Sequence, residues 1–223
     1  MHTTDSRNKL TGWLLLLMAF MTFFFLYNTI YTSTMNYNSE KIHSLFYFTI
    51  QTNIMMLFLM VFLSIYILSA ERLMKFSVNP NFAATLTTYI LITGSIYWAI
   101  LVPTFYKPGA DNTWLFSPSN IWTHTIVPLT GVILLLFVKA VPNKAPVKKK
   151  SLLFFIYPVL YSCLGIYLAI NGKYMYPMFN PVMLGGWGFV GLSLVVILGI
   201  FTGVYYFLLR ITANETEGTG YLI

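Results

Sequence analysis

The stretch FTIQTN, residues 48–53, places polar side chains inside a long apolar run that extends over about residues 42–70. At about 100° per residue of an α-helix, Thr52 and Asn53 fall within roughly 60° of Thr49. Gln51 points to nearly the opposite side. Polar groups at membrane depth need hydrogen-bond partners inside the protein, because lipid offers none. We therefore expect the face that carries Thr49 to meet another polar group within the fold.

The composition indicates an integral membrane protein. Hydrophobic residues make up 57% of the chain and charged residues 9%, whereas a soluble domain carries about 25% charged residues. Apolar stretches of about 20 residues predict six spans, at about residues 10–31, 42–70, 82–106, 121–141, 151–170 and 185–211. The sequence thus predicts one all-α domain over residues 1–223, a bundle of six transmembrane helices with structured outer loops.

The distribution of positive charge predicts the orientation in the membrane. The net charge is +7, but it is not gathered as a nucleic-acid-binding surface would require. In the six-span arrangement ten of the thirteen Lys and Arg residues lie on one side, and only Lys41, Lys107 and Lys173 lie on the other. Because positive residues accumulate on the cytoplasmic side, we expect a multi-pass protein of the cell membrane with both termini in the cytoplasm. Nucleic acid is excluded as a partner.

A second polar residue, His124, lies in the fourth predicted span, and it is the one histidine well inside an apolar run. Pro128 has no amide to donate to the His124 carbonyl, so the helix should bend beside the histidine. Asn120 lies one turn earlier on nearly the same face. We predict that Thr49 and His124 meet and form the working site. The supporting polar residues are Thr52, Asn53, Asn120 and Tyr176.

The outer loops should cover this site. Residues 107–120 contain Pro, Gly and Asp turn signals and Trp114, which predict a structured cap. Tyr176 lies in the next outer loop, where tyrosines are ordinary interfacial anchors, and we expect it above the site. Thr49 lies about seven residues into its span, or roughly 10 Å. An acyl ester could therefore enter sideways from the outer leaflet.

Several kinds of site are not indicated by the sequence. It has no glycine-rich phosphate loop followed by Lys and no Cys or His pairs at metal-ligand spacing. We therefore expect no cofactor and no metal. Cys163 is the single cysteine, so no intramolecular disulfide is possible. A membrane lipid or acyl ester remains the expected partner, and the oligomeric state is left open.

The chain resembles the androgen-induced gene 1 family, which includes the androgen-dependent regulator of tissue factor pathway inhibitor and related bacterial six-span proteins. The resemblance covers about the second to the sixth span. It rests on the order and spacing of three segments, which are Phe-Thr within residues 45–53, Asn120-x-x-x-His124-Thr125 leading to Pro128, and Tyr176-Pro177 followed by Phe179.

Eukaryotic members of that family hydrolyse fatty acid esters of hydroxy fatty acids with a membrane-embedded threonine and a histidine. The resemblance implies that Thr49 is the nucleophile and that His124 is its base. Either Asn53 or Asn120 could then donate to the oxyanion. Two other readings stay open. One is a non-enzymatic lipid-binding or small-solute transport protein, and the other is a structural subunit with no apolar pocket at Thr49.

The predicted orientation can be tested by cysteine accessibility in a Cys163→Ser background. Asn112→Cys should react with a membrane-impermeant maleimide from outside intact cells, because residue 112 lies in an outer loop. Lys149→Cys should react only after the cells are opened. The reverse pattern would overturn the orientation and would move the site to the inner leaflet.

Overall fold

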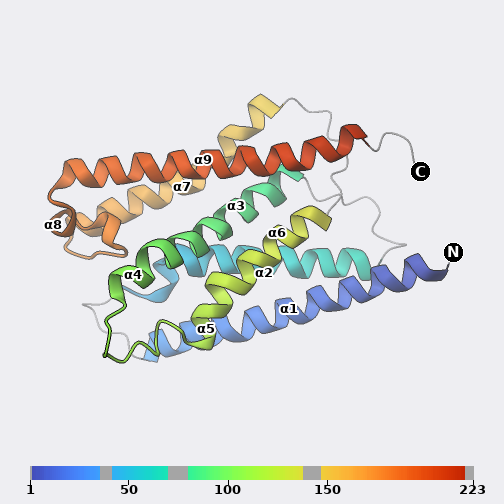
Figure 1. The fold of residues 1–223 in the computed structure, drawn as a ribbon, viewed down its shortest axis with the longest axis horizontal. Coiled ribbons are helices and arrows are strands. Elements are labelled where there is room, and N and C mark those ends of the chain that lie inside the picture. The colour runs from blue at the N-terminus through green and yellow to red at the C-terminus, as the bar shows by residue number, and fades with distance from the viewer. Residues whose placement is uncertain (1, 36–41, 70–79, 138–146, 219–223) are drawn as a thin grey trace.

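The computed structural model describes residues 2–35, 42–69, 80–137 and 147–218, and within these ranges helices are joined by turns, with no strand (Figure 1). The longer helices are α1 (His2–Met35), α2 (Phe48–Leu68), α3 (Pro80–Ile96), α6 (Val127–Phe137), α7 (Val147–Ile170) and α9 (Trp187–Gly218). Shorter helical segments are η1 (Ser44–Phe46), η2 (Tyr97–Leu101), α4 (Val102–Phe105), α5 (Pro118–Ile121), η3 (Trp122–Ile126), η4 (Pro177–Phe179) and α8 (Pro181–Leu184).

The helices are those of a membrane protein, as predicted. Within the described ranges four are long and apolar enough to cross a membrane, namely Lys9–Met35, Phe48–Leu68, Phe82–Phe105 and Trp187–Arg210. The predicted spans at 121–141 and 151–170 correspond to α5–η3–α6 and α7. The described apolar part of α7, Phe154–Ile170, is shorter than the other four. The all-α membrane fold is therefore confirmed, and the count of six crossings stays a prediction.

The chain ends are arranged as an even number of crossings would place them. The start of α1 and the end of α9 lie at one end of the molecule, and α4, α5 and α8 gather at the other (Figure 1). Several of the charges used for the orientation, Lys41, Arg72, Lys75, Lys139 and Lys144, lie outside the described residues.

An aromatic core holds α2, α3, α7 and α9 together. Phe48 of α2 packs edge-on against Phe201 of α9, with ring centroids 5.7 Å apart. Tyr89 of α3 stacks on Phe154 of α7 at 5.5 Å, and Phe154 stacks on Tyr205 of α9 at 4.3 Å. The hydroxyl of Tyr89 donates to the Phe154 carbonyl at 2.5 Å, so this polar group is satisfied within the apolar core.

Two prolines reshape the helices next to the site. Pro103 and Pro128 each follow a π-helical turn, η2 and η3, in which the Val102 amide donates to the Tyr97 carbonyl and the Val127 amide to the Trp122 carbonyl. The sequence predicted a bend beside His124, before Pro128. A π turn adds one residue to the helical turn, and such turns are one of the identified causes of kinks in helices.

The two π turns pack against each other. The rings of Tyr97 and His124 stack with centroids 4.0 Å apart, and Trp98 Nε1 donates to Thr125 Oγ1 at 2.9 Å. Gly94 of α3 permits this close approach, because a Cβ at residue 94 would lie 2.6 Å from the carbonyl oxygen of His124. The position of His124 therefore depends on α3 as well as on its own helix.

Helix α2 begins later than predicted. Residues 42–70 were expected to form one span, but His43 caps the separate turn η1 by accepting from the Leu45 amide at 3.2 Å. Tyr47 then has an extended backbone (φ −73°, ψ 134°), and α2 starts at Phe48. Thr49 consequently lies in the first turn of the helix and not seven residues deep. Amides of the first turn have no partner within the helix, so the Thr49 amide can bond outside it.

The close approach at Gly94 generates a stability prediction. Gly94→Ala should lower the free energy of unfolding by about 1–3 kcal/mol, because the added methyl meets backbone that cannot move aside. Gly203→Ala is the matched control, since a Cβ at residue 203 has no heavy atom within 4 Å. It should leave stability unchanged or raise it by up to about 1 kcal/mol. Thermal unfolding in detergent measures both, and equal midpoints for the two variants would contradict the contact.

Candidate active site

Thr49 and His124, which are 75 residues apart, lie within contact distance. Thr49 Oγ1 of α2 is 3.4 Å from Nε2 of His124 in η3. His124 is buried, with 8% of its surface exposed. A strong hydrogen bond to a hydroxyl is about 2.8 Å long, so proton transfer requires the pair to close by roughly half an ångström. Such bonds are often long before substrate binds.

The other ring nitrogen fixes the state of the histidine. Nδ1 lies 2.9 Å from the Asn120 carbonyl oxygen and 3.0 Å from Thr123 Oγ1. The Thr123 hydroxyl itself donates to the Ser119 carbonyl at 2.9 Å. A carbonyl can only accept, so Nδ1 carries the proton of the neutral ring. Nε2 is therefore left with its lone pair directed at Thr49, as a general base requires.

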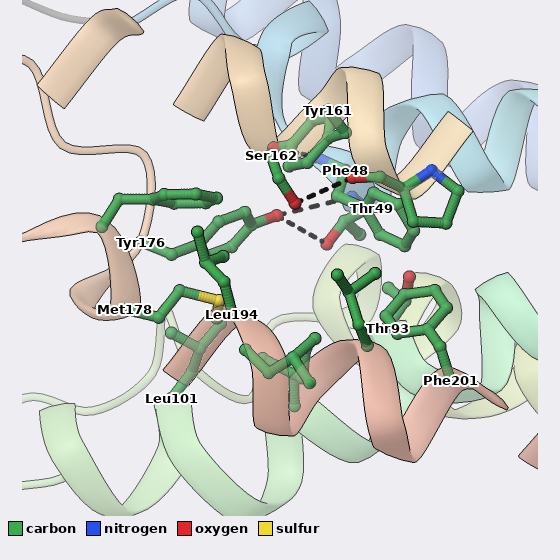
Figure 2. A pocket seen from close by; sticks show the side chains of 15 residues that line it. Phe48, Thr49, Thr93, Leu101, Tyr161, Ser162, Tyr176, Met178, Leu194 and Phe201 are labelled. Carbon is green, nitrogen blue, oxygen red and sulfur yellow. Dashed lines mark hydrogen bonds between the residues drawn. The ribbon is translucent and has the colours of Figure 1, made fainter. Parts of the chain in front are cut away.

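A tyrosine hydroxyl lies beside the same threonine. The hydroxyl of Tyr176 is 3.4 Å from Thr49 Oγ1 and accepts from the Thr49 amide at 3.5 Å (Figure 2). Desolvation by the surrounding protein raises the pKa of Tyr176, so the hydroxyl keeps its proton and can donate. Tyr161 similarly accepts from the Phe48 amide at 2.8 Å. Two tyrosine hydroxyls thus cover the first amides of α2, and Tyr176 is more than a surface anchor.

The two predicted asparagines have different roles. Asn53 is fully buried, and its amide nitrogen donates to the Thr49 carbonyl at 2.8 Å and to the Thr123 carbonyl at 3.2 Å. Both of its donor hydrogens are thereby used, which leaves none for an oxyanion. Asn53 instead ties α2 to η3. The side-chain amide of Asn120 donates to the Trp114 carbonyl at 2.7 Å. Asn120 also lines the cavity beside His124.

Thr52 and Gln51 lie on different sides of α2, as the helical periodicity predicted. Thr52 is buried on the side of Thr49, where its hydroxyl lies 3.1 Å from the Thr49 carbonyl and 3.0 Å from Thr93 Oγ1 of α3. It therefore joins α2 to α3 beneath the site. Gln51 faces elsewhere and accepts from the Tyr157 hydroxyl at 2.7 Å. Thr52 positions the helix and does not line either cavity described below.

Two cavities meet at Thr49. The larger has a volume of about 630 Å³, and its walls include Thr49, His124, Tyr176 and the cap residues Trp114 and Leu115. The smaller has a volume of about 50 Å³, and its walls include Thr49 and Tyr176 together with apolar side chains of α7 and α9 (Figure 2). Among the described residues that line either cavity, none is charged.

The loop over the larger cavity is structured, in agreement with the predicted cap. Asp111 Oδ1 accepts from the amide and the hydroxyl of Thr113, at 2.9 and 2.6 Å. These bonds lower the pKa of Asp111 and hold a turn, as the sequence indicated. Leu115 is fully buried, and its carbonyl accepts from the hydroxyl of Tyr97, the residue that stacks on His124.

Sequence reasoning did not single out Tyr97 or the bonding roles of Tyr161 and Tyr176. One signal for Tyr97 was present. Tyr97 precedes Pro103 by six residues, and Trp122 precedes Pro128 by the same number. The two π turns therefore begin at the same distance before a proline. The tyrosines that cap α2 gave no such signal, because the start of that helix was placed too early.

Comparison of the chain with protein-family models, with curated proteins and with solved structures finds no match. Membership of the family suggested by the sequence motifs therefore stays a prediction. Within the described ranges no group of His, Cys, Asp and Glu side chains could hold a metal ion. The chemistry that these residues offer at Thr49 is that of hydroxyls and one imidazole.

The bridging role of Asn53 can be tested by Asn53→Ala. The change removes the donor shared by two buried carbonyls and should cost about 1–3 kcal/mol of unfolding free energy. Gln51→Ala is the matched control, because it removes an amide of the same helix that does not join α2 to η3. Its effect should be smaller, as Gln51 is only half-buried. A wild-type unfolding temperature for Asn53→Ala would show that the bridge does not hold the site.

Proposed function

We propose that the protein is an intramembrane lipid-ester hydrolase in which Thr49 is the nucleophile and His124 is its base. The observation that carries the proposal is the orientation of His124, whose Nδ1 is 2.9 Å from the Asn120 carbonyl while Nε2 is 3.4 Å from Thr49 Oγ1. The suggested substrates are fatty acid esters of hydroxy fatty acids or related acyl esters, as the resemblance implies.

In the first step the base activates the hydroxyl. A threonine hydroxyl is a weak nucleophile until a neighbouring group takes its proton. Nε2 of His124 takes the Thr49 proton while Oγ1 bonds to the ester carbonyl carbon. The Asn120 carbonyl stabilises the imidazolium that forms by accepting from Nδ1, and the stacked Tyr97 ring keeps the imidazole in place.

The charge on the tetrahedral intermediate needs donors close to Oγ1. The Tyr176 hydroxyl is one such group, and the Thr49 amide, whose bond to that hydroxyl is long at 3.5 Å and easily exchanged, is the other. The amide end of a helix also carries partial positive charge. Removing one oxyanion donor typically slows an enzyme by about 10²–10³-fold. Tyr176 therefore takes the role that the sequence alone suggested for Asn53 or Asn120.

When the carbonyl re-forms, the bond to the alcohol oxygen breaks, and this oxygen leaves with the proton from Nε2. The second step releases the acyl group. Water enters through the larger cavity, and His124 removes a proton from it as it attacks the acyl-threonine. The walls of that cavity include the polar residues Thr29, Asn120 and Asn180, which make it suitable for water. The acid is released, and Thr49 recovers its proton through Nε2.

The proposed setting is the outer half of the cell membrane, with both termini in the cytoplasm. The charge distribution of the sequence supports this orientation. The start of α1 and the end of α9 lie at one end of the molecule, away from α4, α5 and α8 (Figure 1). An ester held at the bilayer surface would then meet the cap and the cavity beneath it.

Lipid binding without chemistry is the second candidate function. The larger cavity, at about 630 Å³, has the size of ordinary small-molecule sites, which range over about 300–1,000 Å³. Binding requires the cavity but gives no reason for Nε2 to be directed at a hydroxyl. A purely structural subunit would require neither the cavity nor the orientation of His124 toward a hydroxyl.

Mutations of the pair separate these functions. Thr49→Ala and His124→Ala should each reduce turnover of long-chain acyl esters by purified protein to near background, and the double variant should be little worse, because the two act as one unit. Thr49→Ser keeps the hydroxyl and should retain measurable activity. Tyr176→Phe should lower kcat by about 10²–10³-fold. Monodisperse elution checks the folding of every variant.

His43→Ala is the matched control, since His43 lies at η1 and does not line either cavity. It should keep most of the activity. Full turnover by Thr49→Ala would remove the threonine mechanism. Absence of turnover by the unmutated protein, with retained lipid binding, would favour the binding function.

A further inference from the structure

The ester bond of a bound substrate would lie between the two cavities. Thr49 and Tyr176 line both of them, whereas His124 and Asn120 line only the larger. Phe179 and its neighbours on α7 and α9 line only the smaller. The two halves of an ester therefore have two separate directions in which to extend from Thr49.

We propose that the small cavity binds the acyl chain and that the large cavity binds the alcohol part, an inference that rests on the proposed function. As Thr49 Oγ1 bonds to the carbonyl carbon, its proton passes to Nε2 of His124. When the carbonyl re-forms, the bond to the alcohol oxygen breaks, and that oxygen takes the proton from Nε2. The leaving oxygen must therefore be on the side of His124, in the large cavity. The acyl chain extends from the same carbon toward the small one.

The shapes and linings of the cavities agree with this assignment. The small cavity is almost wholly apolar, as an acyl chain requires, and its volume of about 50 Å³ holds only a short part of such a chain. The large cavity has more than ten times this volume, and its walls include the polar residues Thr29, Asn120 and Asn180. These residues suit a bulky alcohol part that bears its own polar group. Because none of the described lining residues is charged, that polar group should be neutral.

Phe179 is the residue that limits the acyl site. Its ring is 2% exposed and forms part of the wall of the small cavity. The ring packs directly on Gly165 of α7, where an added Cβ would lie 2.4 Å from it. The absence of a side chain at residue 165 thus allows the ring to lie against α7. A methyl at that position would displace the ring toward the cavity, and a smaller residue at 179 would extend the cavity.

The test is the chain-length profile of hydrolysis for p-nitrophenyl esters with acyl chains of increasing length. Phe179→Leu should raise kcat/KM for long chains relative to medium chains by about tenfold, and Gly165→Ala should lower this ratio by a similar factor. Phe105→Leu makes the same change in the wall of the large cavity only. It should leave the acyl profile unchanged and alter the preference among alcohol parts.

A second measurement does not depend on turnover or on the Phe179 variant. A fatty acid that carries a terminal diazirine is photo-crosslinked to Thr49→Ala, and the labelled residues are mapped. Labels at Met178, Phe179 or Leu194 support the assignment, and labels confined to Phe105 or Trp114 overturn it. Unchanged acyl profiles in active Phe179→Leu and Gly165→Ala also overturn it while the hydrolase function stands. Absence of turnover by the wild type sinks the hydrolase function, and the crosslinks still decide which cavity holds the chain.

Discussion

The site depends on the inability of proline to donate a backbone hydrogen bond. Pro103 and Pro128 are each the second residue of a regular helix, α4 and α6, and each of these helices is preceded by a π turn. Within the apolar core, freed carbonyls must find partners, and in η3 the Thr123 carbonyl accepts from the Asn53 side chain. The two turns contact each other through the side chains of residues 97 and 98 on one and 124 and 125 on the other. That packing stacks Tyr97 on His124 and directs the His124 carbonyl toward Gly94.

The same requirement shapes the start of α2. The first amides of a helix have no internal partner, and those of Phe48 and Thr49 bond to the hydroxyls of Tyr161 and Tyr176. The tyrosines come from α7 and from the loop before η4, so they join distant parts of the chain to this one helix end. Satisfying the backbone in this way also places the Tyr176 hydroxyl beside Thr49 Oγ1.

The sequence predicted the meeting of Thr49 with His124, the helical membrane fold and the opposite orientation of Gln51, because periodicity and polarity are local properties of the chain. It did not predict where α2 begins, since Leu45 and Phe46 continue the apolar run. The extended Tyr47 packs against Tyr176, which is distant in the chain. The role of Asn53 was missed for a related reason. A buried amide can donate to a ligand or to a carbonyl, and the choice depends on the neighbouring η3, whose π turn is not evident in the sequence.

The late start of α2 also explains why the Thr49 hydroxyl lacks the usual bond within its own helix. Buried threonines such as Thr22, Thr88 and Thr130 donate to the carbonyl four residues earlier, which satisfies the hydroxyl and makes it inert. For Thr49 that carbonyl belongs to Leu45, which precedes the helix and accepts from the Gln51 side chain at 2.9 Å. The Thr49 hydroxyl is left with the two 3.4 Å contacts to His124 and Tyr176. A weakly held hydroxyl can approach a substrate at little cost, and both of its neighbours are groups that such chemistry needs.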